Sequence, residues 1–476
     1  MNKTVPMWIN GNAVESCSTR HGDIYNPASG EVIRTVAFAN EADVDRAVVA
    51  AATAFPAWRE TSSLNRARIL NRFRDLLQKN HESLARLISE EHGKTVSDAM
   101  GSIQRGIEVV EFAVGAPHLL KGAFSENVAH DIDCHSVLQP LGVCAGATPF
   151  NFPAMVPLWM FPMALACGNT FVLKPSEKVP SASMRMAELL KEAGLPDGVL
   201  NIVHGDGETV DALISHPAVA AMSFVGSTAV ARHIYETAAR HGKRVQALGG
   251  AKNHAVVAPD ADIEAAADAL MSAAFGSAGQ RCMAISAVVA VGGAGDAISA
   301  ALTRKARQLA SADMGPIISA AQRERVRTAI AEGVSQGASL MLDGREQAAP
   351  NAGNGFFLGP TIFDNVTAEM SIYQREIFGP VLVVLRVASI DDAIALVNRN
   401  PYGNGVAIFT KSGGAARRFE NEIEVGMVGV NVAIPIPMAF YSFGGWKSSL
   451  FGDLSMHGME GVYFYTRRKT ITSRWG

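Results

Sequence analysis

The stretch TFVLKPSEKVPSASMRMAELLKEAGLPDGVLNIVHGDGETVDALISHPAVAAMSFV, residues 170–225, carries the pattern that decides the fold. A β-branched run at Thr170–Leu173 is followed by a Lys-Pro-Ser-Glu turn and by a helical pattern over Ser181–Ala193. Two further β-branched runs, Gly198–Val203 and Ala221–Val225, enclose a second helical pattern. Strands that alternate with helices are typical of a mainly parallel sheet, because parallel strands need a crossover between them. The stretch therefore predicts an α/β fold.

The alternation continues on both sides of this stretch. Upstream, Glu41–Trp58 and Ser63–His92 have the spacing of amphipathic helices. Downstream, further strands are predicted at Ala255–Val257, within Glu376–Leu385 and at Val425–Val430. We expect two α/β domains that meet near residue 250, with a ligand cleft between them.

The C-terminal tail contains two segments that favour strands. Tyr463–Tyr465 is aromatic, and Lys469–Arg474 is basic and β-prone. Neither segment has an obvious partner nearby in the sequence. We expect the tail to join the segment Ser125–Leu138 in an arm used for oligomerisation.

Composition excludes several classes of function. The chain has 476 residues, 48% of them hydrophobic, and a formal net charge of -3, which leaves no basic excess for binding nucleic acid. Residues 1–12 lack the features of a signal peptide, and no run of 18 apolar residues occurs, so we expect a soluble, cytoplasmic protein without membrane contacts. The five cysteines form no CxxC pair and no metal-ligand spacing, which predicts neither disulfides nor a metal site.

One cysteine lies in a setting suited to chemistry. The segment Phe275-Gly-Ser-Ala-Gly-Gln-Arg-Cys282 places Cys282 after small residues, where the backbone can approach a cleft closely. Arg281 beside it could lower the pKa of the thiol and so favour the nucleophilic thiolate. An isolated cysteine is more often a small buried hydrophobe, so this pattern alone is modest evidence.

A set of motifs spread over the whole chain gives Cys282 its context. They are ATPFNFP (147–153), ALACGNT (164–170), FVLKPSE (171–177), FVGST (224–228), GQRC (279–282), EIFGP (376–380) and NRNPYG (398–403). In composition and order they resemble the aldehyde dehydrogenase superfamily. The resemblance implies an NAD-binding Rossmann-type domain of residues 1–120 and 140–250, and an α/β catalytic domain of residues 251–430. It also implies a small β arm of residues 121–139 and 455–476, and a homo-oligomer that is a dimer or a tetramer.

The resemblance assigns Cys282 as the catalytic nucleophile and Asn151 as its partner. The Asn151 side-chain amide, together with the Cys282 backbone N–H, would donate to the oxyanion formed on the attacked aldehyde, and losing one such donor typically costs ~10²–10³ in rate. Without the family motif, an Asx turn before Pro153 would be the preferred interpretation of Asn151.

The resemblance also implies the cofactor and its site. Lys174 and Glu177 would hold the adenosine ribose, and a carboxylate there would favour NAD over NADP because it repels a 2′-phosphate. Gly226 and Ser227 would meet the pyrophosphate at a helix N-terminus. Three further residues would complete the cofactor site: Glu376 at the nicotinamide ribose, Phe378 beside the ring, and Phe150.

One departure from the family pattern points to a branch. The family's catalytic Glu-Leu-Gly-Gly-Lys motif corresponds here to Gln246-Ala-Leu-Gly-Gly-Ala-Lys252, which places either Leu248 or Ala247 at the glutamate position. Neither side chain can act as a base. The chain therefore resembles the branch that transfers the acyl group to coenzyme A. The stretches GAKNH (250–254) and GQRCMAIS (279–286), together with the tail over 452–475, narrow the resemblance, which then implies methylmalonate semialdehyde and malonate semialdehyde as substrates. A hydrolytic enzyme with a base elsewhere remains the alternative.

The resemblance nominates two arginines for the substrate carboxylate, Arg105 and Arg281. A guanidinium group can bind both oxygens of a carboxylate. For Arg105 the alternative is an ion pair on a helix surface. The segment Arg307–Met314 is shorter than the usual loop of the family, and no site residue depends on it.

Overall fold

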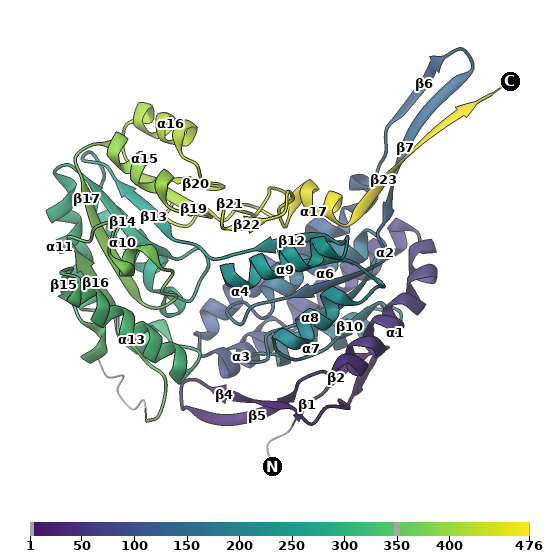
Figure 1. Cartoon of the computed structure of the whole chain (residues 1–476), viewed down its shortest axis with the longest axis horizontal. Coiled ribbons are helices and arrows are strands. Elements are labelled where there is room, and N and C mark those ends of the chain that lie inside the picture. Colours follow the sequence, from purple (N-terminus) through teal and green to yellow (C-terminus); the bar gives the residue numbers. More distant parts are fainter. Residues whose placement is uncertain (1–3, 347–352, 476) are drawn as a thin grey trace.

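The computed structural model describes residues 4–346 and 353–475, so the ends of the predicted domain ranges at residues 1–3 and 476 lie outside it. Two sheets flanked by helices form the body of the molecule (Figure 1). The predicted α/β fold is confirmed.

The larger sheet has the strand order β22-β12-β11-β8-β9-β10-β2-β3. Its five central strands are parallel, namely β8 (Val143–Ala147), β9 (Thr170–Lys174), β10 (Leu200–Ile202), β11 (Val219–Val225) and β12 (Arg244–Leu248). The helices that connect them are α6 (Met155–Ala166), α7 (Ser181–Glu192), α8 (Gly207–Ser215) and α9 (Thr228–Arg240). The antiparallel edge strands are β2 (Met7–Ile9), β3 (Asn12–Val14) and β22 (Leu450–Phe451). The alternation predicted over residues 170–225 is therefore present.

The second sheet has the order β15-β16-β17-β14-β13-β19-β20. Its strands are β13 (Asn253–Val257), β14 (Ile285–Val291), β15 (Ser339–Leu342), β16 (Thr361–Asp364), β17 (Val381–Val387), β19 (Gly405–Phe409) and β20 (Met427–Val430). Helices α10 (Ile263–Phe275), α11 (Ala294–Ala306), α13 (Ala320–Ser335), α15 (Ile390–Arg399) and α16 (Gly413–Glu422) accompany it. A short helix, α12 (Ser311–Met314), lies in the segment predicted to be a shortened loop. Among the described residues, the second sheet has one buried apolar cluster, and the larger sheet has two, whose residues alternate along its strands and so lie on opposite faces.

The N-terminal helices are α1 (Glu41–Glu60), α2 (Ser63–Lys79), α3 (His81–His92) and α4 (Val96–Val114). The single helix predicted over residues 63–92 is wrong, because the chain divides at Asn80. The Asn80 side-chain amide donates to the Leu76 carbonyl at 2.8 Å, and the Ser83 hydroxyl donates to the Asn80 carbonyl at 2.8 Å. These side-chain bonds compete with the helical pattern and end one helix where the next begins.

A three-stranded antiparallel arm projects from the body (Figure 1). Strand β23 (Thr466–Arg474) pairs along β7 (Ile132–Pro140), which in turn pairs with β6 (Phe124–Ala129). The predicted pairing between the tail and the segment near residues 125–138 is therefore confirmed.

The aromatic part of the tail was predicted wrongly as a strand. Tyr463 and Phe464 end α17 (Gly458–Phe464), and Tyr465 follows the helix. Phe464 and Tyr465 are buried in the core of the larger sheet, and the Tyr465 carbonyl accepts from the Asn169 amide at 2.9 Å. Burial of the two rings outweighs the intrinsic preference of aromatic residues for strands.

None of the helices within the described ranges is long and apolar enough to cross a membrane. In the same ranges, no group of three or more His, Cys, Asp or Glu side chains is arranged to hold a metal ion.

Candidate active site

Cys282 lies on a strained loop between α10 and β14. Ser277, Ala278 and Gly279 have successive positive φ values of 54°, 51° and 69°. A Cβ at Gly279 would lie 2.2 Å from the Gly379 carbonyl oxygen, so only glycine permits this close approach. The approach brings the cysteine loop against the segment that carries Glu376.

Two asparagine side chains fix the backbone of Cys282. The Asn253 amide donates to the Cys282 carbonyl at 2.8 Å, and the Asn404 amide donates to the same oxygen at 3.1 Å. The Gln280 side chain holds the loop from the other end, donating to the Pro316 carbonyl at 3.2 Å and accepting from the Ile318 N–H at 3.0 Å. The nucleophile is therefore held on a preorganised backbone.

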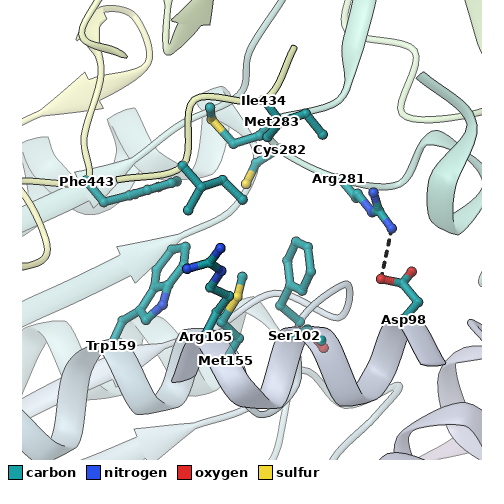
Figure 2. A pocket seen from close by; sticks show the side chains of 13 residues that line it. Asp98, Ser102, Arg105, Met155, Trp159, Arg281, Cys282, Met283, Ile434 and Phe443 are labelled. Atoms are coloured by element: carbon teal, nitrogen blue, oxygen red, sulfur yellow. Dashed lines mark hydrogen bonds and ion pairs between the residues drawn. The ribbon is translucent and has the colours of Figure 1, made fainter. Parts of the chain in front are cut away.

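Cys282 lines two cavities, which share no other residue among those described. The smaller, of about 180 Å³, is lined by side chains from α4 and α6 and by the segment around Ile434 (Figure 2). The larger, of about 910 Å³, extends from the ends of β9 and β11 to Glu376. The thiol therefore stands between a small chamber and a long cleft.

The larger cleft brings together all seven residues predicted to bind the cofactor: Phe150, Lys174, Glu177, Gly226, Ser227, Glu376 and Phe378. The cleft lies at the carboxyl ends of parallel strands, the usual ligand position in open α/β sheets. Ser227 is the N-cap residue of α9. The rings of Phe150 and Phe378 meet edge to face at 5.8 Å. These features fit a dinucleotide.

Lys174 and Glu177 lie side by side at the end of β9. The Lys174 ammonium is buried, donates to the Gly205 carbonyl at 2.8 Å and is 3.6 Å from the Glu177 carboxylate. The pKa of Glu177 is lowered, since the neighbouring Lys174 and Lys178 ammonium groups outweigh its partial burial. Glu177 therefore carries a negative charge at neutral pH, the property that would disfavour a 2′-phosphate.

Asn151 is buried beside the cysteine loop. Its side-chain amide donates to the Gln280 carbonyl at 3.0 Å. A carboxamide has two N–H donors, so this bond leaves one donor for a ligand. The structure thus places the predicted oxyanion donor in the cleft that also reaches Cys282.

The thiol of Cys282 is kept protonated by its surroundings. Burial raises its pKa to about 12, and the Glu376 carboxylate acts in the same direction. Arg281 lowers the pKa of Cys282, as predicted, but burial and Glu376 outweigh it, and its guanidinium donates to Asp98 at 2.8 Å. Formation of the thiolate therefore requires a change around Glu376 or the arrival of a ligand.

Glu376 is itself an unusual carboxyl. Burial raises its pKa to about 7, although the Ala251 N–H, which donates to it at 3.1 Å, and the Lys252 ammonium both lower that pKa. A Cβ at Gly250 would lie 2.3 Å from the Glu376 oxygen, so the glycine makes room for the carboxyl.

We predict that Glu376→Gln makes Cys282 more reactive. Removing a negative charge near the thiol lowers its pKa, so alkylation by iodoacetamide at pH 8 in the absence of NAD should be about three- to tenfold faster, since one pKa unit is tenfold in thiolate. Glu324→Gln, which removes another carboxyl of the same cleft, is the control and should leave the rate unchanged. If Cys282 in Glu376→Gln is alkylated at an unchanged or slower rate, the Glu376 carboxylate does not raise the pKa of Cys282.

The small chamber contains both arginines predicted for the substrate carboxylate. Arg105 and Arg281 line it together with the aromatic Trp159 and Phe443 (Figure 2). Phe152 is a third aromatic residue of the lining. The chamber is also lined by Asp98, Gly101, Ser102, Met155, Met283, Ile434 and Ile436. The chamber is thus apolar with two cations at its wall, which suits a short carboxylated aldehyde.

Both arginines already have acidic partners. Arg105 pairs with Glu108 at 2.9 Å in an i,i+3 arrangement on α4, so the surface ion pair named as the alternative is present as well. Arg281 pairs with Asp98 at 2.8 Å. A bound carboxylate would have to share these guanidinium groups, each of which has five N–H donors.

Neither of the two positions that correspond to the family's catalytic glutamate carries a side chain that could activate water. Leu248 and Ala247 are both buried in apolar cores, on the last residues of β12.

Four residues that hold this site were missed from the sequence: Lys94, Asn253, Gln280 and Asn404. Asn253 and Asn404 are 29 and 122 residues from Cys282, so no local spacing could have related them to it. Gln280 lies inside the GQRC motif and could have been noticed there.

Comparison with known proteins gives consistent matches over the full chain. The model of the aldehyde dehydrogenase family matches residues 13–471. A malonate-semialdehyde dehydrogenase of Pseudomonas aeruginosa is 56% identical over 98% of this chain and 95% of its own length. A Dictyostelium discoideum protein named as a probable acylating methylmalonate-semialdehyde/malonate-semialdehyde dehydrogenase is 49% identical over 99% of this chain and 91% of its own length.

Solved structures agree with these matches. The methylmalonate-semialdehyde dehydrogenase of Oceanimonas doudoroffii superposes with a TM-score of 0.98 at 54% identity, covering 100% of this chain and 99% of that chain. A Sinorhizobium meliloti protein solved in complex with NAD superposes with a TM-score of 0.99 at 51% identity, with the same coverage. With its cysteine between a dinucleotide-shaped cleft and a small chamber, and with these relatives, the chain belongs to the aldehyde dehydrogenase family.

Proposed function

We propose that this protein oxidises malonate semialdehyde and methylmalonate semialdehyde with NAD and transfers the acyl group to coenzyme A. The products would be acetyl-CoA or propionyl-CoA, carbon dioxide and NADH. The observation that carries the proposal is the position of Cys282, which lines both the long cleft and the chamber that contains Arg105 and Arg281. The names of the relatives support the choice of substrates.

The residues of the chain have distinct tasks in this reaction. Arg105 and Arg281 hold the substrate carboxylate, so that the aldehyde carbon faces Cys282. The Cys282 thiolate adds to that carbon, while the Asn151 amide and the Cys282 N–H donate to the resulting oxyanion. NAD, bound in the long cleft, supplies the hydride acceptor. Loss of the hydride leaves a thioester on Cys282.

Two further steps release the product. The carboxylate leaves as carbon dioxide, and the carbon that held it takes a proton. The thiolate of coenzyme A then attacks the thioester carbonyl, forms the acyl-CoA and returns Cys282 as a thiolate. Coenzyme A brings its own nucleophile, so this step needs no carboxylate at Leu248 or Ala247.

The arm formed by β6, β7 and β23 is proposed to join subunits in a dimer or tetramer. Phe124 and Val128 on its outer strand and Trp475 at its end are large exposed hydrophobic residues. Such residues on a projecting sheet edge favour association with another chain.

A substrate panel tests the proposed reaction. Malonate semialdehyde, methylmalonate semialdehyde, propanal and succinate semialdehyde are each assayed for NADH and for acyl-CoA, with NAD and coenzyme A present. The two proposed substrates should give the highest kcat/KM, with acetyl-CoA or propionyl-CoA and carbon dioxide in equal amounts to NADH. Preference for propanal, or acyl-CoA without carbon dioxide from malonate semialdehyde, would overturn the proposal.

We predict that Arg105→Leu reduces the use of carboxylated aldehydes much more than the use of propanal. Losing one partner of a paired charge within a site costs ~2–5 kcal/mol, which corresponds to roughly 30-fold or more in kcat/KM. Arg86→Leu, which removes an exposed arginine paired with Glu82 on the surface of α3, is the control. Equal losses on both kinds of aldehyde would mean that Arg105 supports only the fold.

One observation favours the hydrolytic alternative. Glu376 lines the same cleft as Cys282, interacts with its thiol and has a pKa of about 7, so it has the properties of a general base. In that case water would release a free carboxylic acid. The dependence of the steady-state rate on coenzyme A separates the two reactions.

A further inference from the structure

We infer that Lys94 is a positioning residue for catalysis, which holds Asn151 in place and keeps a positive charge behind the reacting thiol. The inference rests on the proposed chemistry at Cys282. Lys94 comes from the turn between α3 and α4, outside the motifs that identify the active site.

The Lys94 side chain reaches the backbone of Asn151. It is fully buried, with 1% of its surface exposed, and its ammonium donates to the Asn151 carbonyl at 2.7 Å. The same ammonium lies 4.3 Å from the centre of the Phe152 ring. The Lys94 ammonium thus contacts both Asn151, the predicted oxyanion donor, and Phe152, the next residue.

The turn that carries Lys94 runs along the whole segment 150–152. The His92 ring stacks on the Phe150 ring, with the ring centres 5.9 Å apart. Lys94, two residues further along the chain, contacts Asn151 and Phe152. Gly93 between them has a φ of 88°, and a Cβ there would lie 2.4 Å from Pro316. The turn is therefore conformationally fixed.

These contacts close a ring with the cysteine loop. Gly93 packs on Pro316, whose carbonyl accepts from the Gln280 side chain at 3.2 Å. The Gln280 carbonyl accepts from the Asn151 amide at 3.0 Å. Lys94 completes the ring by donating to the Asn151 carbonyl. Such a closed set of contacts fixes the distance between the oxyanion donor and Cys282.

The charge of Lys94 is also placed to act on Cys282. Burial lowers the pKa of Lys94 to about 8, while the Asp98 carboxylate and the Cys282 thiolate both raise it. Since the interaction between two groups is mutual, the ammonium favours the thiolate in turn, although burial and the Glu376 carboxylate dominate the pKa of Cys282 itself. A buried ammonium with a carbonyl acceptor is costly compared with an apolar side chain of the same size. Lys243 is also buried on backbone carbonyls, so the contacts of Lys94 with Asn151 and Phe152, and not its burial alone, assign the cation to the reaction.

Lys94→Met tests the inference, with Lys243→Met as the matched control. Lys243 is also a buried lysine that donates to two backbone carbonyls, those of His216 and Val219, but it lines neither cavity at Cys282. Three quantities are measured on the full-length protein: the rate of the first turnover of NADH, the Kd of NAD, and the pH profile of Cys282 alkylation by iodoacetamide. Thermal unfolding is recorded for each variant.

Lys94→Met should slow the first turnover by about 10²-fold, the typical loss for one displaced oxyanion donor, while the Kd of NAD changes little. The alkylation profile should shift to higher pH, and Lys94→Arg should recover part of both effects. Lys243→Met should leave the rate and the profile unchanged, even where it lowers the Tm.

Several outcomes would overturn the inference. They are a first turnover that Lys94→Met slows less than about threefold, an unmoved alkylation profile, or equal effects in Lys243→Met. If Lys94→Met does not fold, Lys94→Gln, which keeps an N–H donor without the charge, takes its place and should still shift the profile. Failure of both variants to fold, with a folded Lys243→Met, would assign Lys94 a purely structural role. An unmodified protein that forms no NADH would instead overturn the proposed function, and the alkylation profile would still report on Lys94.

Discussion

Cys282→Ser is expected to reduce NADH formation by roughly four orders of magnitude or more, a loss typical of removing a catalytic nucleophile. A serine hydroxyl attacks a carbonyl only when a base removes its proton. Among the described residues, no histidine lines either cavity at Cys282, and no side chain forms a hydrogen bond with its sulfur that could serve as the proton acceptor for a hydroxyl. The hydroxyl would therefore stay protonated.

The variant should retain the cofactor site. The seven predicted cofactor residues line the cleft independently of the sulfur atom, so the Kd of NAD, measured by calorimetry, should change by less than about threefold. Cys17→Ser, at an exposed cysteine, is the control and should behave as the unmodified protein. Turnover by Cys282→Ser close to that of the unmodified protein would remove Cys282 from the mechanism.

The second large effect is expected at deacylation. Without coenzyme A, malonate semialdehyde and NAD should give a burst of about one equivalent of NADH per active site, followed by a slow steady rate. Water is a poor nucleophile without a base, and Leu248 and Ala247 are buried hydrocarbons at the position of the hydrolytic glutamate. Adding coenzyme A should raise the steady rate by about 10²-fold or more, within the range that general base catalysis supplies, and convert the product to acyl-CoA.

Leu248→Glu provides the complementary measurement. A carboxylate there should raise the steady rate without coenzyme A, provided that the pH exceeds its pKa, which burial beside apolar side chains will raise. Leu248→Gln is the matched control, because it has nearly the same shape and cannot take a proton. A steady rate of the unmodified protein that coenzyme A leaves unchanged, with free acid as the product, would move the enzyme to the hydrolytic branch.

The sequence by itself determined the class of fold and the identity of the chemical groups. The alternation over residues 170–225 required parallel strands with helical crossovers, and these are β9, β10 and β11 with α7 and α8. Short motifs predicted residues that line one cleft. Lys174 ends β9 and Ser227 caps α9, where local geometry already directs them at a ligand, whereas Glu376 and Phe378 lie in the loop before β17 and were predicted only from the family resemblance.

Only the tertiary structure decided how these groups act together. The predicted helix over residues 63–92 is divided at Asn80, because side-chain hydrogen bonds there compete with the helix. The tail is helical up to Phe464, because burial of Phe464 and Tyr465 outweighs their preference for a strand. The high pKa of Cys282 depends on burial and on Glu376, which lies 94 positions further along the chain. Lys94 reaches Asn151 across 57 residues. Burial, electric fields and long-range hydrogen bonds depend on distance in space, and local sequence patterns report only on neighbours along the chain.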